Sequence, residues 1–181
     1  DCTKAFDEYD FNKAYQAINT FCVVDMSNFY LDIIKDRLYT SKTDSVKRRA
    51  AQSTMYEILS ALVRLIAPIT CFTAEEIWKH MPHKKDENVE SIMLEFWPKV
   101  NEQYENKDLE EKWNRIIKIK EEASKALEVA RVEKVIGHSL NAKVIINADK
   151  ESYEFLKEKE DLLQEVFIVS AVEINEVEEF S

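Results

Sequence analysis

The chain has 181 residues, 45% of them hydrophobic and 10% aromatic, and a formal net charge of −10 at pH 7. This length and apolar content exclude a disordered chain and allow one good-sized domain, or one domain with a small appendage. A single glycine and three prolines favour long helices and exclude phosphate cradles built from glycine-rich loops. Because no apolar run approaches the ~20 residues of a membrane-spanning helix, we expect no membrane contact.

The three cysteines, Cys2, Cys22 and Cys71, are widely separated and form no C-x-x-C pair. This arrangement is typical of a reducing compartment and of neither a disulfide framework nor a zinc site. We therefore expect a cytoplasmic protein in which Cys22 and Cys71 are small buried apolar side chains. The chain starts without methionine and without a signal region, so we expect a piece of a longer polypeptide.

The first predicted elements are amphipathic helices. Asp10 is a good N-cap, and apolar residues recur at helical spacing from residue 11 to residue 22. Short polar side chains at residues 25–28 can cap a new turn, so we expect a change of register there, before a helix that ends near Thr40. A polar loop over residues 41–44 then leads to a helix capped by Asp44 or Ser45.

Residues 51–78 form the centre of the predicted bundle. Their apolar stripe runs into Pro68, which cannot continue the hydrogen-bond ladder, so this helix must end or bend near Ala67. Thr73 followed by Glu76 has the pattern of a capping box and predicts the start of another helix. Trp78 on that helix is expected to anchor the core.

The C-terminal part begins irregularly and becomes periodic again. We expect an extended segment over residues 91–97 and a long helix from about residue 106 to about residue 135 that places Trp113 in the core. Gly137, the only glycine, is its expected C-cap.

Beyond Gly137 the period changes to that of strands. Residues 140–146 and 167–174 predict two strands, and residues 152–159 a helix between them. The fold class is therefore mainly α: a helical bundle over residues 1–137, which includes the long helix, and a small α/β unit over residues 138–181. The last six residues are expected to be a frayed tail.

Candidate catalytic and metal-binding residues are few. His80 and His83 have a spacing that can bind a metal, but Pro82 and nearby lysines favour a solvated turn. Ser139 beside His138 does not make a nucleophile with its base, because adjacent side chains rarely face each other usefully. We expect no catalytic residue, no metal site and no cofactor in this chain.

Positive charge gathers in one part of this acidic chain. Residues 35–64 contain seven basic and three acidic side chains, whereas residues 1–34 contain two and six. Lysine and arginine supply affinity for phosphates, and tyrosine can stack on an unpaired base. The candidate RNA-binding residues at this corner of a predicted helical hairpin are Lys35, Arg37, Tyr39, Lys42, Lys47, Arg48 and Arg49. Charge alone favours a solvated surface slightly over RNA binding. Arg131 and Lys134, interleaved with glutamates on the long helix, are two further candidates.

Four blocks of the sequence resemble a known family. They read FCVVDMSNFYLDIIKDRLYT (residues 21–40), AAQSTMYEIL (50–59), RLIAPITCFTAEEIW (64–78) and ALEVARVEKVIGHSLNAKV (126–144). In this order they resemble the anticodon-binding region of the isoleucyl-tRNA synthetases, which are class I aminoacyl-tRNA synthetases. Each block is shared in part with the valyl and leucyl relatives, and the run KDRLYT favours the isoleucyl family.

The resemblance implies a helical bundle that binds the anticodon stem and loop and positions tRNA(Ile) for aminoacylation by a distant catalytic domain. The adenylate-forming motifs of the family, His-Ile-Gly-His and Lys-Met-Ser-Lys-Ser, do not occur in this sequence, and neither does an editing domain or a cysteine-rich zinc module. ATP, zinc and both reactions would therefore belong to other parts of an isoleucine–tRNA ligase. This chain would be a monomeric, non-catalytic part of it, with tRNA(Ile) and the catalytic and editing domains as partners.

Three alternatives remain open at this point. One is a helical protein–protein interaction module that uses an exposed apolar or acidic face. Another is the equivalent domain of a valyl or leucyl synthetase. An independent hydrolase would need a deep pocket with paired catalytic groups, and the sequence offers no candidates for them.

Overall fold

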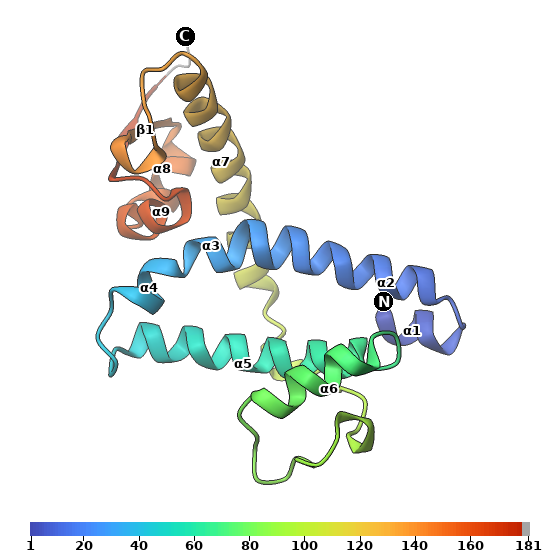
Figure 1. The fold of residues 1–181 in the computed structure, drawn as a ribbon. Helices are drawn as coiled ribbons and strands as arrows, with labels where there is room; N and C mark the ends of the chain where they lie inside the picture. The colour runs from blue at the N-terminus through green and yellow to red at the C-terminus, as the bar shows by residue number, and fades with distance from the viewer. Residues whose placement is uncertain (179–181) are drawn as a thin grey trace. The chain divides into compact units, whose positions relative to one another are not determined.

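The computed structural model describes residues 1–178, so the expected frayed tail lies partly outside the described residues. The chain divides between Asn101 and Glu102 into two compact units (Figure 1). The sequence placed the division after the long helix, at residue 137, whereas the structure places it before that helix.

The N-terminal unit opens with a line of helical segments. They are α1 (Cys2–Asp7), α2 (Phe11–Thr20), η1 (Phe21–Tyr30), α3 (Leu31–Ile33) and α4 (Lys35–Tyr39). The Asp10 carboxylate accepts a hydrogen bond from the Lys13 backbone N–H at 3.0 Å, which confirms the predicted cap. The cap expected at residues 25–28 is wrong. The chain continues there in the wider turns of a π-helix, which shift the register while the helix goes on.

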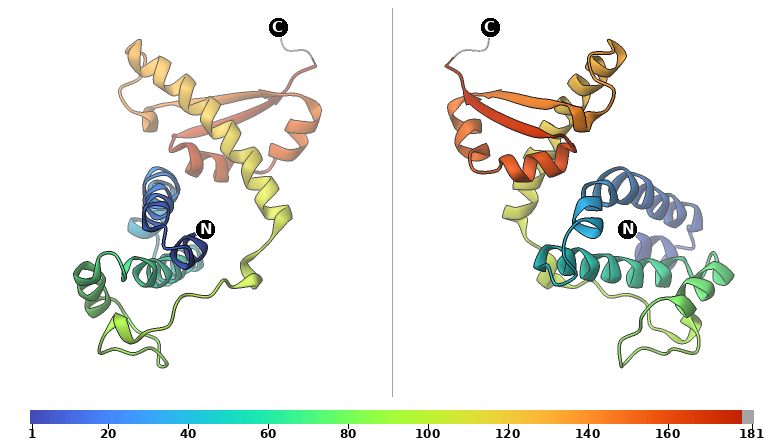
Figure 2. Two further views of the ribbon diagram at one scale, coloured as in Figure 1. Left: turned by 90° about the vertical axis from the view of Figure 1, so that its right-hand side faces the viewer. Right: turned by 60° about the vertical axis from the view of Figure 1, so that its left-hand side comes forward.

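Two further helices complete this unit: α5 (Val46–Ile66) and α6 (Cys71–His80). Figures 1 and 2 show that the line from α2 to α4 runs back alongside α5, so that α4 and α5 make a hairpin. Ser45 caps α5 by accepting from the Arg48 backbone N–H at 3.5 Å, and α5 ends before Ala67, as predicted.

The start of α6 differs from the prediction. The Ile69 and Thr70 backbone N–H groups both donate to the Ile66 carbonyl, at 2.9 and 2.8 Å, so the chain turns tightly after α5. As a result α6 begins at Cys71, and Thr73 lies inside the helix instead of capping it. Cys71 is exposed and Cys22 is half-buried, so neither is the buried side chain that was expected.

Trp78 lies at the centre of the core of the N-terminal unit, with 1% of its surface exposed, as predicted. Its indole N–H donates to the Asn88 carbonyl at 2.8 Å, which ties the segment after α6 to the core. That segment contains the 3₁₀ turn η2 (Ile92–Leu94) and is therefore not extended throughout. The buried members of the core are Val63, Ala67, Ala74, Trp78, Met81 and Ile92.

The C-terminal unit consists of one long helix and a small α/β layer. Its elements are η3 (Glu102–Tyr104), α7 (Lys107–Val132), η4 (Ser139–Asn141), β1 (Lys143–Ala148), α8 (Lys150–Leu156), α9 (Glu160–Phe167) and β2 (Ala171–Glu176). The two strands pair in parallel, with Lys143 opposite Ala171. The mainly α fold with two strands joined through helices is thus confirmed. Helix α7 packs against α9 and falls within this unit. Trp113 on α7 is half-buried.

The start of helix α7 agrees with the prediction from the sequence, and its end does not. The Asn106 side chain accepts from the Leu109 backbone N–H at 2.9 Å, close to the predicted start. At the other end, Lys134 takes the left-handed conformation with φ 60°, and Gly137 has no positive φ. The Val135 N–H bonds to the Ala130 carbonyl at 2.9 Å, so the final turn closes before Gly137, and the predicted glycine C-cap is wrong.

Candidate nucleic-acid interface

The connection between α4 and α5 is held by hydrogen bonds from both sides. The Thr40 backbone N–H and hydroxyl both donate to the Asp36 carbonyl, at 2.9 and 2.7 Å. Within the loop, the Ser45 N–H donates to the Lys42 carbonyl at 3.0 Å. These bonds give the end of the hairpin a defined backbone, which is what a surface needs in order to bind a partner without first becoming ordered.

Seven candidate residues predicted from the sequence lie at this end of the hairpin, on α4, on the loop or on the first turn of α5 (Figure 1). We call them the hairpin tip: Lys35, Arg37, Tyr39, Lys42, Lys47, Arg48 and Arg49. Five are exposed, among them Tyr39 with 83% of its surface, while Arg37 and Arg48 are half-buried. The hydrogen bond that Lys35 donates to Asp32 at 2.5 Å raises the pKa of the Lys35 amino group, so Lys35 stays charged at neutral pH.

Arg48 differs from the other cations because its side chain turns back onto the loop. Its guanidinium Nη1 donates to the Ser41 carbonyl at 2.8 Å. Its Nε is buried and has no hydrogen-bond partner among the described residues. Arg48 therefore fixes the loop that presents its neighbours, a role that the sequence pattern alone did not indicate.

Arg64 belongs to the same basic stretch of sequence but not to the hairpin tip. It lies sixteen positions beyond Arg48, roughly 24 Å along α5. There its Nη2 pairs with Glu87 at 3.0 Å and Glu95 at 3.1 Å, and its guanidinium lies 5.0 Å from the Trp78 ring. This cation is part of the internal support of the unit.

Glu87 joins the segment after α6 to α5 through several donors. Burial alone would raise the pKa of its carboxyl. Hydrogen bonds from the Lys84 backbone N–H at 2.8 Å and from Arg64 outweigh this effect. The Tyr56 hydroxyl also donates to this carboxylate, at 3.1 Å. The net result is a pKa below its usual range, so Glu87 is ionised at neutral pH.

Arg131 and Lys134 lie at the end of α7 in the C-terminal unit. Arg131 forms an ion pair with Glu128, one turn earlier on the same helix. Lys134 occupies the first left-handed position after the helix. These two residues form a second candidate surface of their own.

The histidines that resembled a metal pair have different surroundings. His80 is exposed, and its Nδ1 lies 2.8 Å from the Glu76 carbonyl. The His83 side chain is only 16% exposed and packs 4.6 Å from the Trp78 ring, so the solvated turn expected from the sequence is wrong for His83. The described residues contain no group of three or more His, Cys, Asp or Glu side chains placed to hold a metal ion.

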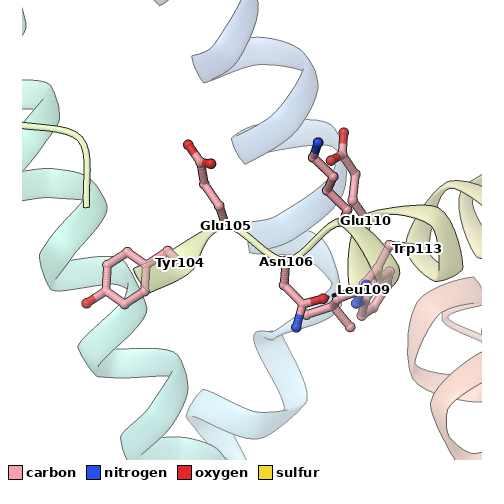
Figure 3. Close-up of a pocket in the computed structure, with 7 residues that line it drawn as sticks. Tyr104, Glu105, Asn106, Leu109, Glu110 and Trp113 are labelled. Carbon is pink, nitrogen blue, oxygen red and sulfur yellow. Dashed lines mark hydrogen bonds between the residues drawn. The ribbon is translucent and has the colours of Figure 1, made fainter. Parts of the chain in front are cut away.

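A hollow of about 530 Å³ lies at the start of α7, and Figure 3 draws the residues that line it. Its residues are Tyr104, Glu105, Asn106, Lys107, Leu109, Glu110 and Trp113. This set contains no serine, cysteine or histidine that could serve as a nucleophile or a base at neutral pH. Separately, no helix in the described part of the chain is both long and apolar enough to cross a membrane.

Lysines and arginines gathered in one place are the electrostatic footprint of a nucleic-acid-binding surface. Residues 1–146 match the protein family described as the anticodon-binding domain of tRNA ligase. The match covers most of the chain, and the chain belongs to this family.

Three similar proteins indicate which kind of tRNA ligase the chain resembles. The chain is 55% identical over 175 residues to the isoleucine–tRNA ligase of Caldicellulosiruptor saccharolyticus and 52% over 177 residues to that of Caldanaerobacter subterraneus subsp. tengcongensis. It is 48% identical over 179 residues to that of Natranaerobius thermophilus. These matches cover 96, 98 and 99% of the chain, and the chain spans 19% of the length of each relative. The resemblance to the isoleucyl family is confirmed.

Proposed function

We propose that this chain binds the anticodon stem and loop of tRNA(Ile), and so positions the tRNA for aminoacylation by a catalytic domain elsewhere in the polypeptide. The observation that supports this most directly is the hairpin tip. Its exposed cations and Tyr39 lie on α4, on α5 and on the ordered loop that joins these helices, in a chain that belongs to a family of anticodon-binding domains. Phosphate contacts supply the affinity, and the tyrosine supplies a stacking surface.

The charge of the rest of the chain supports the same assignment. With a net charge of −10, most of the molecule repels a polyanion, and the hairpin tip is the larger of the two basic candidate surfaces that can attract one, since Arg131 in the other is paired with Glu128. ATP and amino-acid binding then belong to the other domains of the polypeptide, which are the second partner of this chain. The monomeric state and the cytoplasmic location expected from the sequence remain predictions.

The experiment is a titration of the chain with an anticodon stem-loop RNA at several salt concentrations. Replacing Lys47 and Arg49 by alanine should weaken binding, and the plot of log affinity against log salt should become shallower by about 0.7–0.9 for each phosphate that is no longer neutralised. A matched control is the Lys4→Ala, Lys13→Ala variant, because it removes two exposed cations from the same unit away from the tip. Identical slopes for the wild type and the tip variant would contradict the proposal.

A protein-interaction surface is a second candidate for a different part of the same unit. Phe72 on α6 and Phe96 after η2 are the two most exposed large apolar side chains among the described residues, at 88% and 86%. The Phe72→Ser, Phe96→Ser variant separates the two functions. Unchanged RNA affinity, together with weaker binding to a purified catalytic domain, would assign this surface to protein contact.

A further inference from the structure

The exposed side of α5 contains a polar hollow that begins at the hairpin tip and continues along the helix. Its volume is about 290 Å³, and its lining residues are Arg49, Gln52, Ser53, Tyr56 and Glu57. Spacings of three and four residues place all five on one face of the helix. Arg49 belongs both to the hairpin tip and to this hollow, so the two surfaces are continuous.

Two of the lining residues form a rigid side of the hollow. The Tyr56 hydroxyl donates to Glu87 at 3.1 Å, and the Glu57 carboxylate pairs with the Lys84 amino group at 2.8 Å. The same amino group lies 5.3 Å from the centre of the Tyr56 ring. Because Lys84 pairs with Glu57, the charge of that carboxylate is largely balanced, and it does not prevent an RNA strand from approaching.

The other three residues are available to a ligand. Within the described part of the chain, the side chains of Arg49, Gln52 and Ser53 make no hydrogen bond or ion pair. Together they offer a guanidinium, a carboxamide that both donates and accepts, and a hydroxyl that does the same. A phosphate would use only the donors of this set. The edge of a nucleobase, which alternates donors and acceptors, would use all of it.

We propose that this hollow binds the edge of one unpaired nucleobase, from the RNA loop whose phosphates are held by the hairpin tip. Gln52 and Ser53 then contribute base recognition, and Arg49 bridges the base and the backbone. The base must be unpaired, because pairing would hide the edge that these side chains contact. The inference rests on the proposed function, since it needs RNA at the tip.

The test uses the whole chain and a set of anticodon stem-loop RNAs, each with one loop nucleotide made abasic. Gln52→Ala and Ser53→Ala should each weaken binding of the unmodified RNA by about threefold to tenfold, which is the range for one hydrogen bond. The salt dependence should not change, because neither side chain is charged. One of the abasic RNAs lacks the base that the hollow binds. The wild-type chain should bind that RNA more weakly than the unmodified RNA, and neither substitution should weaken its binding further.

The matched control is Thr54→Ala, an exposed polar position on the same helix outside the hollow, and it should bind every RNA as the wild type does. All three substitutions place alanine in a helix, so circular dichroism should be unchanged. Wild-type affinity of the Gln52 and Ser53 variants, or an equal loss on every abasic RNA, would overturn the base subsite. In that case the shallower salt dependence of RNA binding in the Lys47 and Arg49 variant would still support the proposed function. A wild-type chain that binds none of the RNAs would overturn both.

Discussion

Two neighbouring arginines at the start of α5 have different surroundings. Arg48 is half-buried and donates to the Ser41 carbonyl, whereas Arg49 is exposed and its side chain has no partner among the described residues. If RNA binds at the hairpin tip, Arg48 supports the loop and Arg49 contacts the ligand. Their replacement should therefore have different consequences.

Arg48→Ala removes a hydrogen bond worth about 1 kcal/mol, so backbone amides over residues 41–45 should exchange with solvent several times faster in the free protein. Arg49→Ala should leave that exchange unchanged and should reduce the salt dependence of RNA binding. Hydrogen exchange measured by mass spectrometry, beside an RNA titration, separates the two effects. Equal exchange in both variants would show that Arg48 does not hold the loop.

The contrast between Arg48 and Arg64 also shows where sequence patterns stop being informative. The hairpin tip could be predicted because its members are close in sequence and are separated only by a short loop. The role of Arg64 could not, because its partners Glu87 and Glu95 lie 23 and 31 residues away in an irregular segment. The hollow beside Arg49 was missed for the same reason, since Glu87 and Lys84 fix its rigid side.

The predicted helix starts agree with the structure where the capping side chain bonds to the first turn of its own helix. Asp10, Ser45 and Asn106 each accept from a backbone N–H three residues later, and such a bond depends only on the neighbouring chain. The predictions failed where the backbone had another way to satisfy its donors. The turn after α5 places the start of α6 at Cys71, so Thr73 lies inside the helix, where it cannot be the N-cap. At the end of α7 the chain closes at Lys134 through a backbone carbonyl, so Gly137 is not needed as a cap.

The segment between α6 and residue 97 is held to α5 by charged hydrogen bonds at Glu87 and Glu95, in addition to the core contacts of Ile92, and these bonds make its attachment sensitive to acid. The folded-state pKa of Glu87 is depressed, so its contribution to stability is present above the unfolded pKa of about 4.3. This contribution is lost as the pH falls through the folded-state value. Urea unfolding at a series of pH values below about 5 should show a steep decrease in the free energy of unfolding.

The Glu87→Gln variant provides the comparison for this acid dependence. It should be less stable than the wild type at neutral pH by about 1–3 kcal/mol, because Arg64 loses one of its two charged partners and keeps the other, Glu95. Its stability should then change less between neutral and acid pH, so that the two unfolding curves converge. Parallel curves would show that Glu87 does not titrate in this range.

At the scale of the whole molecule, RNA binding through the hairpin tip of this strongly acidic chain, as proposed above, would have to balance short-range attraction against long-range repulsion. A charge pair about 25 Å apart in water contributes only ~0.2 kcal/mol, and salt at about 0.1 M screens it over ~10 Å. The contacts at the tip should therefore decide the affinity at physiological salt. The remaining charge should affect mainly the rate of association at low salt.

This balance can be tested by neutralising acidic residues on α1 with the Asp7→Asn, Glu8→Gln variant. At about 0.01 M salt its association rate with the stem-loop RNA should rise about twofold, because two repulsive charges are removed. At about 0.15 M salt the rate should match that of the wild type, and the dissociation rate should be unchanged at both salt concentrations. A slower dissociation from this variant would mean that α1 touches the RNA directly, and the contact surface would then extend beyond the hairpin.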